Sequence, residues 1–304
     1  MTDQTQTDQL QTEDFSATGT TSEQGIAAVE ASIDGAVPTK ATKWQTSLWN
    51  YPATYLLMGI NVAVYAAMFA YGPVPGLLRQ GALSGVLTAP FDVDTLLRFG
   101  ATASELVQRG EWWRLVTGAF VHVTLLHILL NMWCLWNLGV FGEPLLGKRG
   151  LVAVYLLTGT AGMLLSFAWS VLSGQPGLVA GASGAVFGIA GILIVLLSNR
   201  RLSVPWEELK KLRGQVILFA VLNLVLGMAP SVISMGPASP LSNYLPRIDN
   251  SAHLGGFVSG LALGLPLFAK MTAGKVAYRQ RQRVTYVVAA FLLCLVTYAL
   301  VKAA

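Results

Sequence analysis

The sequence predicts an all-α fold, a polytopic bundle of helices that spans a membrane. Apolar residues make up 54% of the 304 residues and charged residues only 12%, against ~25% charged residues in a typical soluble domain. The apolar residues gather in long runs, without the alternation of apolar and polar residues that marks the strands of a membrane barrel. Helices surrounded by lipid account for this composition better than a water-soluble globule does.

Seven runs beyond Trp44 are each close to the ~20 residues that a helix needs to cross ~30 Å of hydrocarbon. They cover residues 51–71, 115–141, 151–172, 182–198, 216–235, 252–269 and 284–301. Residues 1–43 differ from the rest, because they are rich in Thr, Gln, Ser and acidic residues and contain no apolar run. This composition predicts a disordered tail, and it lacks the basic and apolar segments of a signal peptide.

Lysine and arginine residues collect on one side of the predicted spans. If the N-terminus is placed inside, the inner segments hold 14 of the 20 basic residues. Because cytoplasmic loops carry an excess of Lys and Arg, we expect a cytoplasmic N-terminus and an external C-terminus. This bias also explains the pI of about 9.3, so no nucleic-acid partner is expected. The inner basic residues are Lys40, Lys43, Lys148, Arg149, Arg200, Arg201, Lys210, Lys211, Arg213, Lys270, Lys275, Arg279, Arg281 and Arg283.

The connection over residues 72–113 is long, external in this topology and mixed in polarity. Its Trp112-Trp113 pair suits the headgroup layer, where tryptophan is enriched. We therefore expect a loop that lies laterally in the membrane interface.

A serine and a histidine stand at the same expected depth in two different spans. Ser183 precedes Arg200 by 17 residues, and His253 precedes Lys270 by 17 residues. Each side chain then lies roughly 26 Å of helix from the basic side of the membrane. Polar groups within a bilayer are costly, so both are functional candidates. Equal depth is one condition for a Ser–His hydrogen bond and hence for nucleophilic chemistry in the membrane.

Small residues recur every four positions on the same two spans, which is the second condition for such a pair. One span carries Gly184 and Gly188, and the other carries Ala252, Gly256 and Gly260. This spacing lets membrane helices approach closely, and facing stripes would bring the serine and the histidine together. Such stripes are also common where helices only pack, so the glycines alone do not establish catalysis.

The second predicted span adds a polar run, His122-Val-Thr-Leu-Leu-His127-Ile-Leu-Leu-Asn131. His127 and Asn131 are four residues apart and share a helix face, with His127 near the level of Ser183. Both are suitable hydrogen-bond donors for the oxyanion of a tetrahedral intermediate, and the alternative is a structural pair between helices. His122 lies five residues before His127, so we expect it to point elsewhere and to have a structural role in the outer loops.

Four stretches carry a family resemblance when they are taken together and in order. They are Glu111-Trp112-Trp113-Arg114, the His122…His127…Asn131 run, Gly181-Ala182-Ser183-Gly184, and Ala252-His253-Leu254-Gly255-Gly256 followed by Gly260. With these motifs the chain resembles the rhomboid intramembrane serine proteases over about residues 51–270. The resemblance implies a rhomboid-like six-helix catalytic core, here residues 44–270, followed within residues 271–304 by a linker and a seventh membrane helix.

The resemblance also implies the roles of the site residues. Ser183 is expected to be the nucleophile, His253 its base, and His127 with Asn131 part of the oxyanion site. The loop over about 72–113 would lie partly in the outer leaflet, with Trp113-Arg114 as its Trp-Arg pair.

Two neighbours of the expected dyad bear on its chemistry. Phe187 stands where some family members carry a tyrosine that stacks on the base histidine, and phenylalanine keeps the ring face. Asp249 lies four residues before His253 but is expected at the loop end rather than as a third catalytic residue. A Ser–His dyad is therefore expected, because a buried unpaired carboxylate is costly in this setting.

The expected function is cleavage of transmembrane protein substrates near the outer leaflet, within the lipid bilayer and without a metal or other cofactor. Cys134 and Cys294 lack metal-ligand spacing and are expected to pack. Compact loops and an outward-facing site favour a bacterial plasma membrane. Two alternatives are an inactive relative that escorts membrane clients and a transporter. Inactive relatives usually lack the serine or the histidine, and the inner halves of the fourth and sixth spans are too apolar for a transport path.

Overall fold

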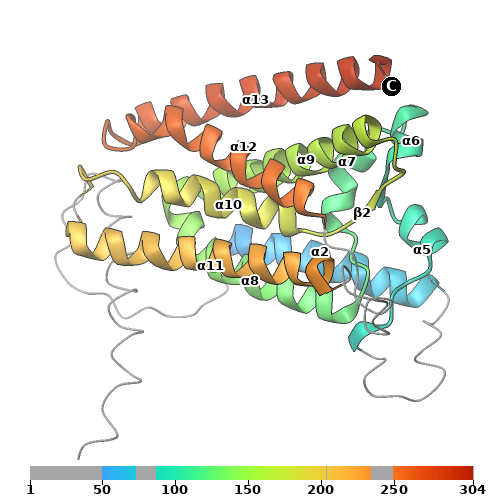
Figure 1. The fold of residues 1–304 in the computed structure, drawn as a ribbon. Helices are drawn as coiled ribbons and strands as arrows, with labels where there is room; N and C mark the ends of the chain where they lie inside the picture. Colours follow the sequence, from blue (N-terminus) through green and yellow to red (C-terminus); the bar gives the residue numbers. More distant parts are fainter. Residues whose placement is uncertain (1–49, 73–86, 203, 234–248, 304) are drawn as a thin grey trace, which may run out of the picture.

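The computed structural model describes residues 50–72, 87–202, 204–233 and 249–303, so the predicted tail over residues 1–43 lies outside the described residues. Five described helices are long and apolar enough to cross a membrane, namely α2 (Pro52–Tyr71), α8 (Leu125–Leu146), α9 (Lys148–Ser173), α12 (Asn250–Phe268) and α13 (Lys275–Ala303). Helix α10 (Ser183–Leu196) is apolar but shorter. Helix α11 (Trp206–Ile233) begins with a charged segment. The expected polytopic helix bundle is confirmed (Figure 1), while the number of seven spans stays a prediction.

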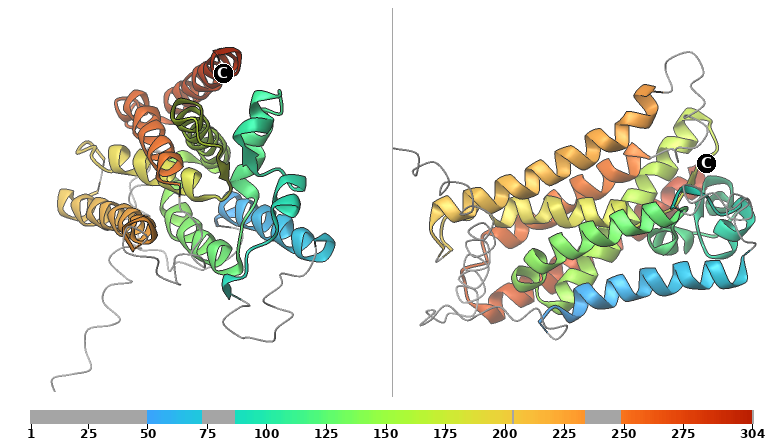
Figure 2. Two further views of the ribbon diagram at one scale, coloured as in Figure 1. Left: turned by 45° about the vertical axis from the view of Figure 1, so that its right-hand side comes forward. Right: turned by 90° about the horizontal axis from the view of Figure 1, so that it is seen from below.

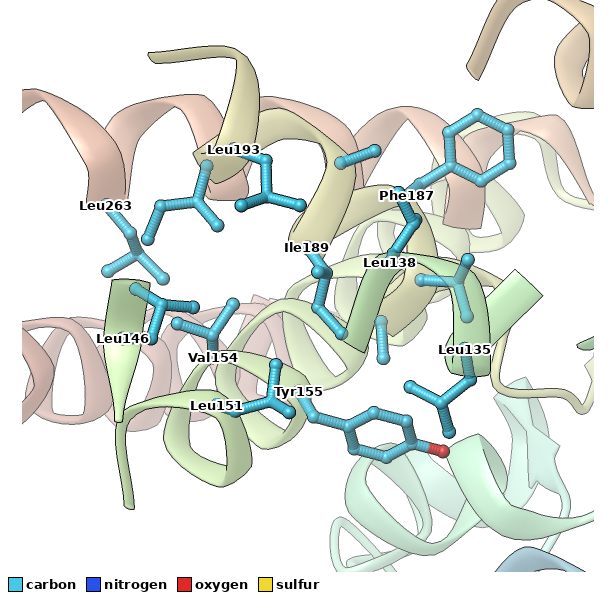
Figure 3. Packing of buried hydrophobic residues seen from close by; sticks show 14 of the residues in the cluster. Leu135, Leu138, Leu146, Leu151, Val154, Tyr155, Phe187, Ile189, Leu193 and Leu263 are labelled. Atoms are coloured by element: carbon cyan, nitrogen blue, oxygen red, sulfur yellow. The ribbon is translucent and has the colours of Figure 1, made fainter. Parts of the chain in front are cut away.

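Helix α10 lies in the interior of the bundle, with α8, α9, α11 and α12 around it (Figures 1 and 2). Its 14 residues are apolar on every face, as is typical of a helix that is buried all round. Figure 3 shows part of the core to which α8, α9 and α10 contribute, including Leu138, Tyr155 and Ile189. The helix that begins at Ser183 is therefore held by protein rather than by lipid.

Helices α10 and α12 meet backbone to backbone, as the small-residue stripes predict. A Cβ atom on Gly256 would overlap the carbonyl oxygen of Gly184, and one on Gly260 would overlap that of Gly188. Only glycine leaves room for this approach. The predicted facing of the two stripes is confirmed, and it fixes the position of α12 relative to the start of α10.

The start of α8 differs from the predicted span over residues 115–141. The apolar run is interrupted by α7 (Arg114–Thr117), by a 3-10 turn η1 (Gly118–Phe120) and by an extended segment at Val121. Helix α8 begins only at Leu125, where the Thr124 hydroxyl accepts a hydrogen bond from the His127 N–H (3.1 Å). The prediction was wrong by ten residues because apolar side chains continue through the turn and hide the break.

Helix α10 also ends earlier than predicted, because Asn199 closes it. The Asn199 amide donates to the Phe268 carbonyl at the end of α12 (2.9 Å), and its oxygen accepts from the Arg201 N–H (3.1 Å). From Ser183 to Leu196 the helix rises only ~20 Å. In contrast, α11 and α13 begin ten and nine residues earlier than their apolar runs, because the helix continues through charged turns outside the hydrocarbon.

The connection between α2 and α8 folds into short elements at one end of the bundle (Figure 1). These are α5 (Val93–Arg98), β1 (Thr102–Ala103) and α6 (Ser104–Gln108). Strand β1 pairs antiparallel with β2 (Leu178–Val179), with Thr102 opposite Val179. Because β2 immediately precedes the loop that leads to Ser183, this pairing ties the connection to the start of α10.

Arg114 holds this connection together from a buried position. Its Nη1 donates to the carbonyls of Leu97 (2.6 Å) and Ala101 (3.1 Å), and its Nε donates to the Glu111 carboxylate (2.7 Å). The guanidinium also lies 4.4 Å from the centre of the Trp113 ring. Arg114, the first residue of α7, is therefore joined to α5 and to the segment just before β1 through one fork-shaped donor group.

A buried carboxylate from α8 caps the start of α2. Glu143 accepts hydrogen bonds from the N–H groups of Ala53 (3.0 Å) and Thr54 (2.8 Å) and from the Thr54 hydroxyl (2.8 Å). The first N–H groups of a helix have no partner within the helix, and a negative charge at that end is favourable. The bundle thus satisfies the first turn of α2 with a residue about 90 positions away.

Candidate active site

Ser183 is the first residue of α10, at the end of a strained turn. Gly181 has a φ of 131°, which favours glycine, and its N–H donates to the Gly118 carbonyl (2.9 Å). Ala182 is fully buried, whereas Ser183 is partly exposed. The turn therefore presents the Ser183 side chain at a helix N-terminus, where backbone N–H groups are still without helical partners.

His253 lies in the first turns of α12 and is 6% exposed. Its imidazole stacks on the Phe187 ring, with 4.5 Å between ring centres and 23° between planes. Phe187 lies one turn after Ser183 on the same face of α10. The stacking therefore turns the histidine towards the face of α10 that carries the serine, and the predicted stacking on the phenylalanine ring is confirmed.

In the described part of the chain, neither the Ser183 hydroxyl nor the His253 imidazole forms a side-chain hydrogen bond. The His253 Nδ1 atom is buried and without a partner there. Catalytic hydrogen bonds are often long in free enzymes and tighten when substrate binds. The structure thus places Ser183 and His253 on two helices in close backbone contact, without a direct bond between the two side chains.

His127 packs directly against the turn that precedes Ser183. A Cβ atom at Gly181 would lie 2.7 Å from Cε1 and 2.8 Å from Nε2 of His127. The imidazole occupies the space that any side chain at position 181 would need. This contact is therefore a second reason, besides the positive φ, why position 181 requires glycine. The start of α10 is therefore contacted from two sides, by His127 of α8 at Gly181 and by Gly256 of α12 at the Gly184 carbonyl.

Asn131 lies one turn deeper on α8 than His127, as predicted. Its amide nitrogen donates to the His127 carbonyl (3.0 Å), and the side chain is buried. A side-chain amide carries two N–H donors, so one remains after this bond. The shared face of His127 and Asn131 points towards the interior, where Ile128 and Leu135 are also buried.

His122 does not point away from this site, so that prediction was wrong. It is fully buried, its ring centre lies 5.1 Å from that of His127, and its Nε2 accepts from the Ala182 N–H (3.4 Å). Its Nδ1 then carries the proton and donates to the Phe120 carbonyl (3.3 Å). Burial lowers the pKa of His122 well below its ordinary value, and nearby His127 lowers it further, which keeps the ring neutral and able to accept.

The reason for this error is the true start of α8. A spacing of five residues places His122 and His127 on different faces only if both lie on one helix. Helix α8 begins after Thr124, so His122 lies outside the helix that carries His127. Thr124, between the two histidines, was the available signal, since threonine is a preferred helix N-cap.

Asp249 caps α12 and also joins it to α9. Its carboxylate accepts from the N–H groups of Ser251 (2.9 Å) and Ala252 (3.3 Å) and from the Ser166 hydroxyl of α9. These bonds agree with the expected place of Asp249 at the loop end. The carboxylate is engaged by the helix start rather than by the Nδ1 atom of His253.

Comparison with known proteins adds sequence similarity to this geometry. A sequence model of the Rhomboid domain matches residues 109–270. Rhomboid protease GluP of Bacillus subtilis (strain 168) is 36% identical over 180 residues, which cover 58% of this chain and 31% of that protein. RHOMBOID-like protein 5 of Arabidopsis thaliana is 34% identical over 187 residues, covering 60% of this chain and 53% of that protein.

Rhomboid-like protease 2 of Toxoplasma gondii is 30% identical over 206 residues, which cover 68% of this chain and 62% of that protein. The chain therefore spans between 31% and 62% of the length of these three relatives. The domain match by itself covers more than half of the 304 residues, and this multi-pass membrane protein belongs to the rhomboid family.

Proposed function

We propose that this chain is an intramembrane serine endopeptidase that cleaves transmembrane segments of membrane proteins, with Ser183 as nucleophile and His253 as base. The main support is the stacking of Phe187 on His253, because Phe187 and Ser183 share a face of α10. The family membership and the relatives named as proteases support the same reaction.

The reaction follows from these side chains. The Ser183 Oγ atom bonds to the carbonyl carbon of a peptide bond while its proton passes to the His253 imidazole. The C–N bond then breaks, and the leaving amine takes that proton. Water adds to the acyl group with His253 again accepting a proton. The bond to Ser183 then breaks as that proton returns from His253 to the Ser183 Oγ atom, and a carboxylic acid is released. Without a third residue the histidine is a weaker base than in a full triad.

The oxyanion of the tetrahedral intermediate is held by three donors. They are the side chain of His127, which packs on Gly181, the side chain of Asn131 one turn further along α8, and the backbone N–H of Ser183. Each such donor contributes about 10²–10³ in rate. His122 does not touch the oxyanion; it holds the backbone of this turn through Ala182.

The substrate segment must leave its helix before it is cut. A peptide carbonyl in a membrane helix is hydrogen-bonded within that helix, so local unwinding has to precede attack by Ser183. Helix-breaking residues near the scissile bond would lower the free energy of this step. We propose single-pass membrane proteins with such a segment as the substrates.

The basic residues support a cytoplasmic N-terminus and a site that opens towards the outer leaflet of a bacterial plasma membrane. Alkaline phosphatase fused after Ala273, between α12 and α13, should be inactive in bacterial cells, whereas fusion after the C-terminus should be active. The reverse pattern contradicts this topology.

The decisive experiment compares the serine at the start of α10 with a serine just beyond its other end. In liposomes, the unmodified chain should cleave a single-pass model substrate and react with a fluorophosphonate probe, and Ser183→Ala should abolish both. Ser198→Ala, just beyond the other end of α10, should retain both. Undiminished cleavage by Ser183→Ala refutes the assignment. Client binding without probe reaction or cleavage by the unmodified, folded protein would instead indicate an inactive escort.

A further inference from the structure

Helix α13 is buried most deeply near its two ends, which anchor it, while Ala289 and Leu293 in its middle are only partly buried against the core. Of its described residues, only Tyr278 and Gln282 at one end and Thr297 at the other are buried. The Gln282 amide donates to the Leu146 carbonyl at the end of α8 (2.9 Å), which fixes the first of these anchors. Along its length α13 lies on the outer side of α9 and α12 (Figures 1 and 2).

Between these anchors a crevice of about 500 Å³ separates α13 from α9 and α12. Its walls are apolar side chains such as Leu164 of α9, Leu263 of α12 and Val288 of α13. From Arg281 to Val296, both of which line it, α13 rises ~22 Å. That length exceeds one leaflet, which is about 15 Å or half of the ~30 Å hydrocarbon core.

The shape selects a chain-like occupant. A helix of ~10 Å diameter over the same ~22 Å would fill roughly 1,700 Å³, which is more than the crevice can enclose. An extended acyl chain is narrow enough to lie in it, and the crevice opens to the side of the bundle where lipid is the solvent. An acyl chain therefore fits this space, whereas a further helix does not.

One charged side chain stands at the end of the crevice where α13 begins. The Arg281 Nε donates to the carbonyl of Pro266 in the last turn of α12 (3.3 Å), one of the carbonyls that a helix end leaves without a helical partner. This bond holds the guanidinium at the mouth of the crevice. A guanidinium has four further N–H donors, and the Thr285 hydroxyl lies one turn along the same wall.

The charged side chains on the three helices that form the crevice are all basic. Helices α9, α12 and α13 contain no Asp or Glu between their printed bounds, so none of the three helices that form the crevice supplies a carboxylate for Arg281. The first nine residues of α13 contain Lys275, Arg279, Arg281 and Arg283. Basic pockets between membrane helices bind anionic headgroups, and guanidinium pairs well with phosphate.

We propose that this crevice binds an anionic phospholipid of the surrounding leaflet, with one acyl chain between α13 and α12 and the phosphate at Arg281. The lipid is a structural ligand that fills the gap between the two anchors of α13. The proposal does not depend on the peptidase function, since it uses neither Ser183 nor His253.

Lipid binding to the purified full chain in detergent tests this proposal, with dioleoylphosphatidylglycerol and dioleoylphosphatidylcholine as probes and native mass spectrometry as readout. The unmodified chain should bind the anionic lipid about tenfold more tightly, the effect of ~1.4 kcal/mol. Arg281→Gln should remove this preference. Arg279→Gln is the matched control, because two positions along a helix place it ~200° away around the axis, and it should stay within about threefold of the unmodified chain.

A second pair of variants tests the acyl chain. Val288 lines the crevice and Val287 does not, so Val288→Trp should weaken binding of both lipids, whereas Val287→Trp should not. If Arg281→Gln and Arg279→Gln lose the preference for the anionic lipid equally, general surface charge explains that preference, and the proposed site is overturned. Undiminished lipid binding by Val288→Trp would also overturn it. If Val288→Trp does not elute as a folded species, Ala289→Leu replaces it in the same wall.

Discussion

Helix α12 packs against α10 and against α13 in opposite ways. Towards α10 it presents Gly256 and Gly260, and the two backbones touch with no room for a methyl group. Towards α13 it leaves a crevice of about 500 Å³. The contact between the two helices that carry Ser183 and His253 is thus a close backbone contact, whereas the contact with α13 leaves open space. Helix α12 is also packed closely on α9, where a Cβ atom on Gly162 would overlap the Ala252 carbonyl oxygen.

The largest effect is expected from Gly260→Val on the tight side. The new side chain collides with the Gly188 carbonyl, so the helices must separate, and the serine and histidine that they carry move apart. We expect a loss of about 3 kcal/mol in unfolding free energy, at the upper end for overpacking, and more than about 10²-fold in cleavage. Ala262→Val, on the crevice side of α12, should cost less than about 1 kcal/mol. Similar losses in both variants, measured by denaturation in detergent and by substrate cleavage, would contradict the difference between the two contacts.

His122→Leu should have the next largest effect. It removes the acceptor of the Ala182 N–H and leaves that buried donor unpaired, which costs about 1–3 kcal/mol. Fluorophosphonate labelling of Ser183 should slow, because the turn before it loosens. His122→Gln supplies an amide oxygen and should recover part of the labelling rate; a labelling rate in His122→Leu equal to that of the unmodified chain would remove His122 from this role.

Phe187→Leu tests the stacking on His253. An aromatic pair contributes about 0.5–1.5 kcal/mol beyond its buried area, so cleavage should fall by about tenfold if the stacking orients the base. Phe187→Tyr keeps the ring and should remain within about threefold. Comparison of kcat for the two variants separates orientation from substrate binding, and equal kcat values would show that the ring is not needed.

The smallest effect is expected at the anchor of α13. Gln282→Leu removes the bond to the Leu146 carbonyl and should cost about 1 kcal/mol of unfolding free energy. Cleavage should be unchanged, since α13 contributes no residue to the site. A cleavage loss as large as that of Phe187→Leu would mean that the α13 contact also positions the dyad.

Much of the fold is predictable because a membrane chain reveals its helices by composition. The runs at α2, α9 and α12 were predicted to within a few residues, and the glycine stripes identified the facing sides of α10 and α12. These features are local, since they depend on side chains that follow one another along a helix.

The missed features depend on partners far away in the sequence. Hydropathy does not detect the turn before α8, because Val121 and its neighbours remain apolar. Neither does it indicate that His122 accepts from the backbone of Ala182, 60 residues away, or that Glu143 caps another helix. Ser183, His253, His127 and Asn131 could be predicted as site residues because each is a polar residue in an apolar run, whereas the contact of His122 with Ala182 depends on how the segment before α8 folds.

The cap on α2 has a practical consequence for work with this protein. Because Glu143 supplies the acceptors for its first turn and Tyr51 provides no side-chain cap, the capping of this helix comes from within the bundle rather than from the residue before it. Affinity tags or fluorescent reporters joined ahead of residue 50 should therefore leave the helix intact, which makes that junction a suitable attachment point for immobilising the protein in single-molecule experiments.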